Sequence, residues 1–298
     1  MPASQSLNQM LQLELMETFL SATQCKVLEN FRALGSKLED YAKLEVTINF
    51  HPDQITSGGF LVLEAIANDG LLRSQFETGT SNGGLTAFPG GDRWKWESKA
   101  FKGLYDSCHV SERPKYGALN HRLSQSGGAP RFGSSHFKLR RHLLERTTFC
   151  YPESWVGPLD YGMADRVKNL IEMADSDTLD LLDNYVEAHI HGPISVENDV
   201  EALVVDPIYK GTEIEKFAEK IKCDIRWHKG FNLSIEEFEF HADYRGAEYV
   251  DLAKLIVVKG HVNPKLIGMA VSQGTYDPQD LKKVWHYLAR FGDLNRVV

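Results

Sequence analysis

The chain has 298 residues, of which 42% are hydrophobic and 25% charged, and its formal net charge is −8 at pH 7. This composition is typical of a globular protein with a buried core, and the negative charge gives no overall attraction to nucleic acid. The sequence shows no apolar run near 18 residues, no secretion signal at its start and four widely spaced cysteines. These features predict a cytoplasmic protein without a membrane segment, a disulfide framework or a zinc ribbon.

The first half of the chain is expected to contain helices and then a glycine-rich region. Residues 1–45 show two successive apolar helical faces, with Gly35 as a possible break. A strand is expected over 44–50, followed by a helix within 57–70 that has Ser57 as its N-cap and Gly70 as its C-cap. Glycine is dense from 73 to 135, which predicts loops and short strands of the kind that wrap a ligand.

The second half of the chain alternates strand-like and helix-like segments. Strands are expected at 184–194, 199–206 and 223–228, and helical segments at 138–146, 162–174, 212–222, 247–260 and 277–292. The order of these elements predicts an α+β fold. We divide the chain into an N-terminal helical segment (1–45), a catalytic domain (46–210) and a C-terminal α/β extension (211–298) packed on that domain.

The segment "NYVEAHIHGPI" (184–194) places a carboxylate and two histidines in one strand. Strand alternation puts Glu187, His189 and His191 on the same face. Together with His51 and Asp53, the two histidines offer the ligand types of a metal-dependent hydrolase. The helical HExxH spacing and any acidic cluster are absent, so hydrogen-bonded histidines without a metal are the simpler interpretation.

Three segments in this order resemble the ADP-ribosyltransferase superfamily, in particular the bacterial toxins that modify nucleic acid. They are "INFHPD" (48–53), "FLVLEAIANDGLL" (60–72) and "YVEAHIHGPISVENDVEALVV" (185–205). The resemblance covers about residues 46 to 207. It implies a split β-sandwich that binds NAD, as a substrate, in a cleft between two small mixed sheets. It also implies a toxin, toxin–antitoxin or phage-defence setting.

The resemblance implies a set of site residues in which Glu187 is the catalytic carboxylate. The set is completed by either of two triads, His51–Tyr116–Glu187 or Arg73–Ser134/Ser135–Glu187. Chemistry agrees with these residue types, because a carboxylate stabilises the oxocarbenium-like ribose and an arginine can bind a pyrophosphate through two hydrogen bonds. Further candidates for NAD binding are Thr78, Gly79, Thr80, Ser81 and His136. No metal is required in this interpretation.

The acceptor of ADP-ribose is expected to be a macromolecule, with nucleic acid slightly favoured over protein. Residues 131–146 carry five basic side chains against one acid, and Trp94, Trp96, Phe101 and Tyr105 offer stacking surfaces. A neutralising antitoxin protein is a further possible partner, and no membrane partner is expected. Two alternatives stay open: the metal-dependent hydrolase described above and a non-catalytic nucleotide-binding module.

Overall fold

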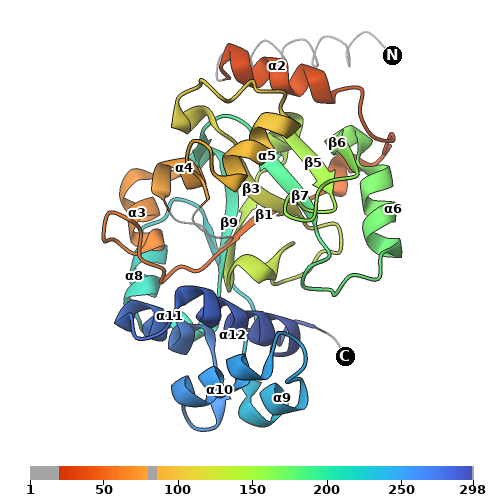
Figure 1. Cartoon of the computed structure of the whole chain (residues 1–298). Coiled ribbons are helices and arrows are strands. Elements are labelled where there is room, and N and C mark those ends of the chain that lie inside the picture. Colours follow the sequence, from red (N-terminus) through yellow and green to blue (C-terminus); the bar gives the residue numbers. More distant parts are fainter. Residues whose placement is uncertain (1–19, 80–85, 297–298) are drawn as a thin grey trace.

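An eight-stranded mixed sheet forms the centre of the computed structural model, which describes residues 20–79 and 86–296 (Figure 1). The strand order is β10-β9-β4-β1-β3-β7-β5-β6; β9 and β10 pair in parallel and the other neighbours pair antiparallel. The strands are β1 (Val46–Phe50), β3 (Lys115–Leu119), β4 (Ser135–Leu139), β5 (Thr147–Tyr151), β6 (Asp160–Met163), β7 (Val186–Ile190), β9 (Val200–Val205) and β10 (Asp224–Trp227). The expected α+β class is therefore confirmed.

Two small sheets and a set of helices surround the central sheet. The small sheets pair β2 (Leu71–Leu72) with β8 (Ile194–Ser195), and β11 (Leu233–Ser234) with β12 (His261–Val262). The α-helices are α2 (Ala22–Phe31), α3 (Val62–Asp69), α4 (Gln75–Thr78), α5 (Asp92–Ala100), α6 (Lys168–Ser176), α7 (Val196–Asp199), α8 (Glu213–Ala218), α9 (Ile235–Phe240), α10 (Ala247–Ile256), α11 (Pro264–Gln273) and α12 (Pro278–Phe291). Short 3₁₀ helices include η3 (Pro130–Phe132) and η4 (Arg141–Arg146).

Several expected boundaries differ from the structure for local reasons. The predicted N-terminal helical segment corresponds, within the described residues, to α2 and the short 3₁₀ helix η1 (Tyr41–Lys43), and Gly35 between them has a left-handed φ of 77°. Helix α3 begins five residues after Ser57, with Leu61 at the N-cap, but it ends at Gly70 as expected (φ 69°). The glycine-rich region contains helix α5, which was not predicted. The segment 138–146 is the end of β4 followed by the 3₁₀ helix η4.

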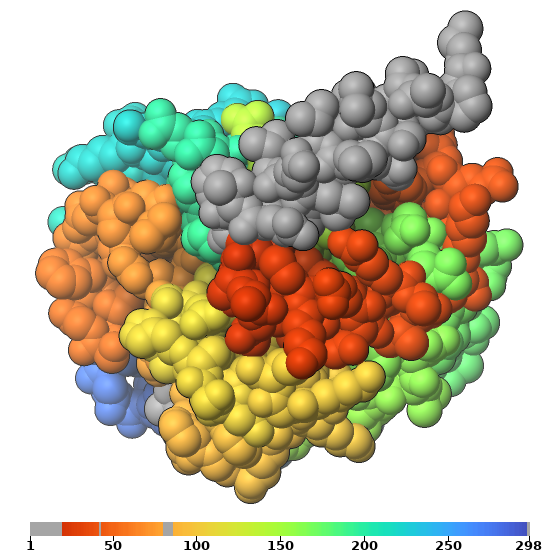
Figure 2. All heavy atoms as spheres, turned by 90° about the horizontal axis from the view of Figure 1, so that it is seen from above, coloured from red at the N-terminus to blue at the C-terminus, as the bar shows by residue number. Residues whose placement is uncertain are grey.

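The two faces of the sheet differ in character. One face carries the main apolar core, which α3, α6 and α8 cover through residues such as Leu63, Leu170 and Ile214. On the other face, over β7 and β5, lie polar side chains that α5 and α2 cover. Seen from above, α2 lies on the surface between the segments that hold Phe101 and Met163 (Figure 2). Helices α9–α12 form a separate core at the opposite end of the molecule from α2 (Figure 1).

The central sheet is held together weakly at one place, between β1 and β3. These strands pair at only two positions, Val46 with Leu119 and Thr47 with Ala118. By contrast, β1 pairs with β4 over four residues and β3 with β7 over five. The sheet therefore consists of two four-stranded halves that diverge beyond Thr47. The loop of residues 126–133 is held beside the opening by hydrogen bonds in both directions: its backbone N–H groups donate to the Thr47 and Asn49 side chains, and its carbonyls accept from the Asn49 amide.

The backbones of β1 and β3 approach each other closely at Gly117, so a larger residue at this position is expected to destabilise the protein. A Cβ at this position would lie 2.5 Å from the backbone oxygen of Thr47. We expect Gly117→Ala to lower the free energy of unfolding by about 1–3 kcal/mol, the usual cost of overpacking. Gly58→Ala is the control, because its Cβ would meet nothing closer than 3.6 Å. Urea denaturation measures both variants, and equal midpoints would contradict the close packing at the junction.

Candidate active site

A cavity of about 210 Å³ lies at the opening between β1 and β3. Its wall contains four of the residues singled out from the sequence: Arg73, Thr78, Tyr116 and Glu187. Other polar groups on the same wall are those of Asn49, Gln54, Asp69, Gln75, Arg93 and Lys115. The structure thus brings together a carboxylate, several cations and an aromatic ring at the point where the two half-sheets diverge.

Glu187 is held from all sides on β7. Its side chain is only 5% exposed. Ser154 donates to Oε2 from its hydroxyl (3.0 Å) and from its backbone N–H (3.4 Å). His189 Nε2 lies 3.0 Å from Oε1, and Arg93 Nη1 lies 3.8 Å from the same oxygen. These contacts fix the carboxylate in one orientation.

The His189 contact with Glu187 is the last step of a buried hydrogen-bond chain. Tyr105 Oη lies 2.7 Å from His191 Nδ1, and Thr148 Oγ1 lies 3.0 Å from His191 Nε2 and 3.1 Å from His189 Nδ1. Because an ionised carboxylate only accepts, His189 donates from Nε2 and accepts from Thr148 at Nδ1. Thr148 then accepts from His191 Nε2, and Tyr105 donates to His191 Nδ1. With both histidines neutral, every polar side-chain atom of this hydrogen-bond chain has a partner.

Electrostatics favours the ionised form of Glu187. Burial alone would raise the pKa of this carboxyl group, but the hydrogen bond from His189, the charge of Arg93 and the hydrogen bond from Ser154 outweigh it and hold the pKa below its ordinary value. Burial, followed by the nearby charges of His189, Arg146 and Lys115, lowers the pKa of His191 well below its usual range. The site therefore presents an ionised carboxylate on Glu187 and a neutral imidazole on His191 at neutral pH.

Arg93 is the functional residue that sequence reasoning missed. It lies in the first turn of α5, where its guanidinium carbon is 4.2 Å from the centre of the Tyr116 ring and its Nη1 donates to Ser154 Oγ at 2.7 Å. Arg93, Trp96, Glu97 and Ala100 share one helical face, and this face covers the polar side of the sheet. That i, i+3, i+4, i+7 spacing was the available signal within the glycine-rich region.

Tyr116 is fixed by a second buried pair. Its hydroxyl donates to Glu97 Oε1 at 2.8 Å, and the other Glu97 oxygen accepts from Arg113 at 2.5 Å. Glu97 is fully buried and Arg113 is 3% exposed. Arg93 covers one face of the Tyr116 ring, which nevertheless forms part of the cavity wall.

The remaining predicted residues lie in other environments. Arg73 is on the cavity wall but is 42% exposed and pairs with Asp69 (2.8 Å) and Glu77 (3.3 Å). Gly79 is the left-handed C-cap of α4, next to Thr78 but outside the lining. Thr80 and Ser81 lie outside the described residues.

The other candidates for NAD binding lie outside this cavity. His51 packs edge-on against Trp285, with ring centres 4.7 Å apart, and lines an adjacent cavity of about 90 Å³. Gln54 lines both cavities, so the two are neighbours. Ser134, Ser135 and His136 are buried at the start of β4 and do not line the cavity around Glu187. The structure therefore places Arg73, Tyr116 and Glu187 on one cavity wall but assembles neither predicted triad in full, because His51, Ser134 and Ser135 lie outside that wall.

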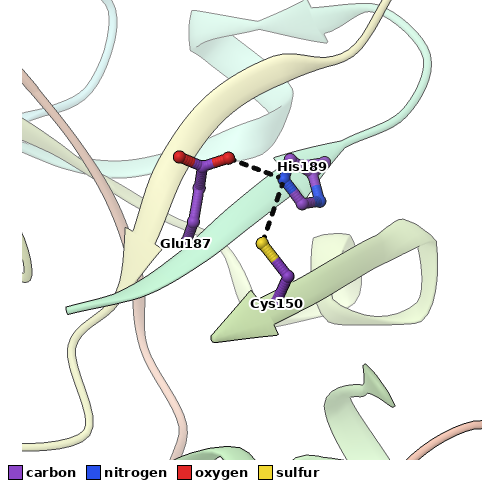
Figure 3. A group of neighbouring side chains, drawn as sticks. All are labelled: Cys150, Glu187 and His189. Atoms are coloured by element: carbon purple, nitrogen blue, oxygen red, sulfur yellow. Dashed lines mark hydrogen bonds and ion pairs between the residues drawn. The ribbon is translucent and has the colours of Figure 1, made fainter. Parts of the chain in front are cut away.

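The expected metal site of His51, Asp53, His189 and His191 is not assembled in the described part of the chain. His51 and Asp53 line the cavity beside α11 and α12, whereas His189 and His191 belong to the hydrogen-bond chain on β7. A different group of metal-binding side chains does gather there: Cys150, Glu187 and His189, whose ligand atoms all lie within 4.8 Å of one another (Figure 3). Three such ligands are typical of an open zinc site. The positive charge of Arg93, 3.8 Å from Glu187, opposes a cation at this place.

The basic segment 131–146 does not form one patch. Arg131 lines a third cavity, whereas Lys138 on β4 pairs with Glu45 (2.6 Å) and Glu201 (3.2 Å). Arg146 donates to backbone carbonyls of residues 191 and 193. Of the predicted stacking aromatics, Phe101 and Tyr105 are buried under α2, and Trp96 lines the third cavity. These five basic side chains therefore do not act as one patch, because Arg131, Lys138 and Arg146 each have local partners.

Comparison with known proteins places most of the chain in one family. A family model described as "Protein of unknown function (DUF3626)" matches residues 45–174 and 159–294. No curated protein matches the chain. Among the described residues, no helix has both the length and the apolar character needed to cross a membrane.

Proposed function

The chain belongs to DUF3626, a family of proteins of unknown function, and we propose that it is an NAD-dependent ADP-ribosyltransferase. The observation that carries this proposal is the ionised, immobilised Glu187 on the wall of a cavity where two half-sheets diverge. The ADP-ribosyltransferase fold is likewise a proposal, supported by the division of the sheet into two four-stranded halves joined at two residue pairs.

The charges on the cavity wall match the two ends of NAD. The nicotinamide ring is cationic and its ribose becomes more positive as the glycosidic bond stretches, so a fixed carboxylate stabilises that end most in the transition state. The pyrophosphate is anionic, and Arg73 lies exposed on the same wall, while Lys115 adds positive charge there although its Nζ donates to three backbone carbonyls. Burial, as the main cause, lowers the pKa of Lys115 to about 8, which leaves this amine largely protonated at neutral pH.

Each residue has a role in the proposed reaction. The bond between ribose C1′ and the nicotinamide nitrogen breaks, and its electron pair leaves with nicotinamide, which becomes neutral. Glu187 stabilises the positive ribose, while His189 and Ser154 keep the carboxylate aimed at the cavity. Arg93 keeps Glu187 ionised and orders Tyr116. An acceptor nucleophile then bonds to C1′ and loses its proton to water. The resemblance extends the proposal to a toxin or phage-defence effector, with a neutralising protein as a possible partner.

Metal-dependent hydrolysis is the second candidate, and the cluster of Cys150, Glu187 and His189 is the observation that favours it (Figure 3). The hydrogen bond between His189 Nδ1 and Thr148 would orient the ring as in many metal-bound histidines. Against it stand the nearby Arg93 and the complete set of hydrogen bonds on Glu187.

Release of nicotinamide from NAD by the purified protein tests both candidates. We expect turnover that survives EDTA and changes less than about threefold in Cys150→Ser, because the thiol touches no substrate in the proposed mechanism. The same substitution removes a zinc ligand, and loss of a ligand or its supporting shell lowers activity by about 10–100-fold or more. EDTA-sensitive turnover with stoichiometric zinc would replace the transferase by the metal enzyme. NAD binding without turnover on any acceptor would indicate a binding module.

A further inference from the structure

A third cavity, of about 490 Å³, adjoins the site on the side of Glu187 that faces Ser154. Arg93 and Phe132 line both this cavity and the one between β1 and β3. Ser154, which donates two hydrogen bonds to Glu187, lines the third cavity. A molecule in the third cavity would therefore approach the same carboxylate from the other side.

The third cavity has an excess of positive charge in a protein of net charge −8. Its lining contains four cations, Arg93, Arg131, Lys282 and Lys283, and two acids, Asp92 and Glu153. Both arginines have carboxylate partners, Glu187 for Arg93 and Asp183 for Arg131. Within the described residues, neither lysine lies within ion-pair distance of a carboxylate; the two occupy the first turns of α12.

The environment of His286 shows the same imbalance of charge. This residue lies one turn after Lys282 on α12 and is fully buried. Burial, followed by the charges of Arg131, Arg245, Lys282 and Lys283, pushes its pKa far below the usual range. Burial also lowers the pKa of Lys282 to about 8, and Arg131 and Lys283 contribute. Unpaired, partly buried cations of this kind are stabilised when an anion binds beside them.

An exposed aromatic ring stands at the same cavity. Trp155 lines it with 76% of the residue exposed, and the neighbouring Val156 and Leu159 are also exposed. An isolated indole beside cations fits an unstacked base followed by its phosphate, because every base has a face that stacks on an aromatic ring. An acidic peptide would satisfy the cations but would leave the face of the indole without a planar partner.

We propose that the third cavity binds single-stranded nucleic acid, with Lys282 and Lys283 on its phosphates and Trp155 stacked on a base, as the acceptor of the transferase. The acceptor role rests on the proposed function, whereas the binding itself does not. The oligonucleotide then enters beside Ser154, and its reacting base or ribose extends past Arg93 and Phe132, which line both cavities, to reach C1′ of the NAD ribose. Its phosphates and stacked base are bound by side chains that do not line the NAD cavity.

Fluorescence anisotropy with a labelled single-stranded oligonucleotide, as a function of salt, tests the binding. Each phosphate contact contributes about 0.7 to the slope of log affinity against log salt for single strands. We expect Lys282→Gln/Lys283→Gln to reduce this slope by about 1.4, and Trp155→Ala to weaken binding by about tenfold through lost stacking. The control is Lys216→Gln/Lys229→Gln, two exposed lysines without ion pairs that line none of the three cavities, which should leave the slope unchanged.

The outcomes separate this inference from the proposed function. Nicotinamide release without acceptor should be unchanged in both lysine double variants, because neither lysine lines the NAD cavity. Oligonucleotide binding that depends on these residues, without any NAD cleavage, would support the nucleic-acid site and refute the transferase. No binding, an unchanged slope in Lys282→Gln/Lys283→Gln, or transfer of label from NAD only into protein would overturn the nucleic-acid site and leave the transferase intact.

Discussion

Glu187→Gln is expected to reduce nicotinamide release from NAD by about 10²–10³-fold, the typical effect of removing one electrostatic partner of a transition-state charge. Glutamine has the shape of glutamate and can keep the Ser154 contact, but it carries no charge to set against the positive ribose. Most of the loss should appear in kcat, because this interaction is strongest in the transition state. Steady-state kinetics over a range of NAD concentrations measures how the loss is divided between kcat and KM.

Glu201→Gln is the matched control for this variant. Glu201 is also a strand glutamate in ion pairs, with Lys138 at 3.2 Å and Arg226 at 3.3 Å, but it lies on β9 away from the three cavities. Its activity should stay within about twofold of the wild type, since exposed pairs contribute little to stability. Equal losses in both variants would show that the effect of Glu187→Gln is structural.

Arg93→Lys is expected to lower kcat/KM by about 100-fold, whereas Arg73→Lys should lower it less than about fivefold. Arg93 uses its planar guanidinium to reach Ser154, Glu187 and the face of Tyr116 together, and an ammonium group cannot reproduce that geometry. Arg73 is 42% exposed and its ion pairs with Asp69 and Glu77 tolerate a lysine. The two values of kcat/KM show which arginine contributes more to the reaction.

The pH profile of kcat/KM tests the contact between Arg93 and Glu187 through the direction in which its acidic limb moves. Arg93 helps to hold the pKa of Glu187 below its ordinary value, so the wild-type activity should fall only when the pH drops below that depressed pKa. Weakening the contact raises the pKa of Glu187, and the acidic limb of the profile should move to higher pH in Arg93→Lys. Arg73→Lys should leave the limb in place. A limb that moves in neither variant would contradict the role of Arg93.

The sequence predicted those parts of the site that local pattern determines. Alternation along 184–194 placed Glu187, His189 and His191 on one face, and the structure confirms this shared face, because Thr148 contacts both histidines and His189 contacts Glu187. The end of α3 at Gly70 followed from the need for a left-handed residue there. These features depend on spacing within one element, which the sequence displays directly.

The parts that were missed depend on contacts between distant segments. Arg93 and Glu187 are 94 positions apart in the sequence, and they meet only because α5 packs on the polar face of β7. His51 was expected to contact NAD beside Glu187. Its ring instead packs against Trp285 of α12 and lines the adjacent cavity. The basic residues of 131–146 are close together in the sequence, but their partners come from distant segments, such as Glu45, just before β1, and Glu201, on β9. Tertiary packing decided each of these outcomes.

We expect NAD to bind at the opening between β1 and β3 with its nicotinamide ribose against Glu187. A crystal structure of Glu187→Gln with NAD tests it most directly, because the variant binds the dinucleotide without consuming it. We predict a ribose hydroxyl about 2.6–3.2 Å from the side chain of residue 187, a hydrogen-bonding distance, with the ring beside Tyr116. NAD bound elsewhere, or a metal ion between Cys150 and His189 in the wild-type crystal, would contradict the account.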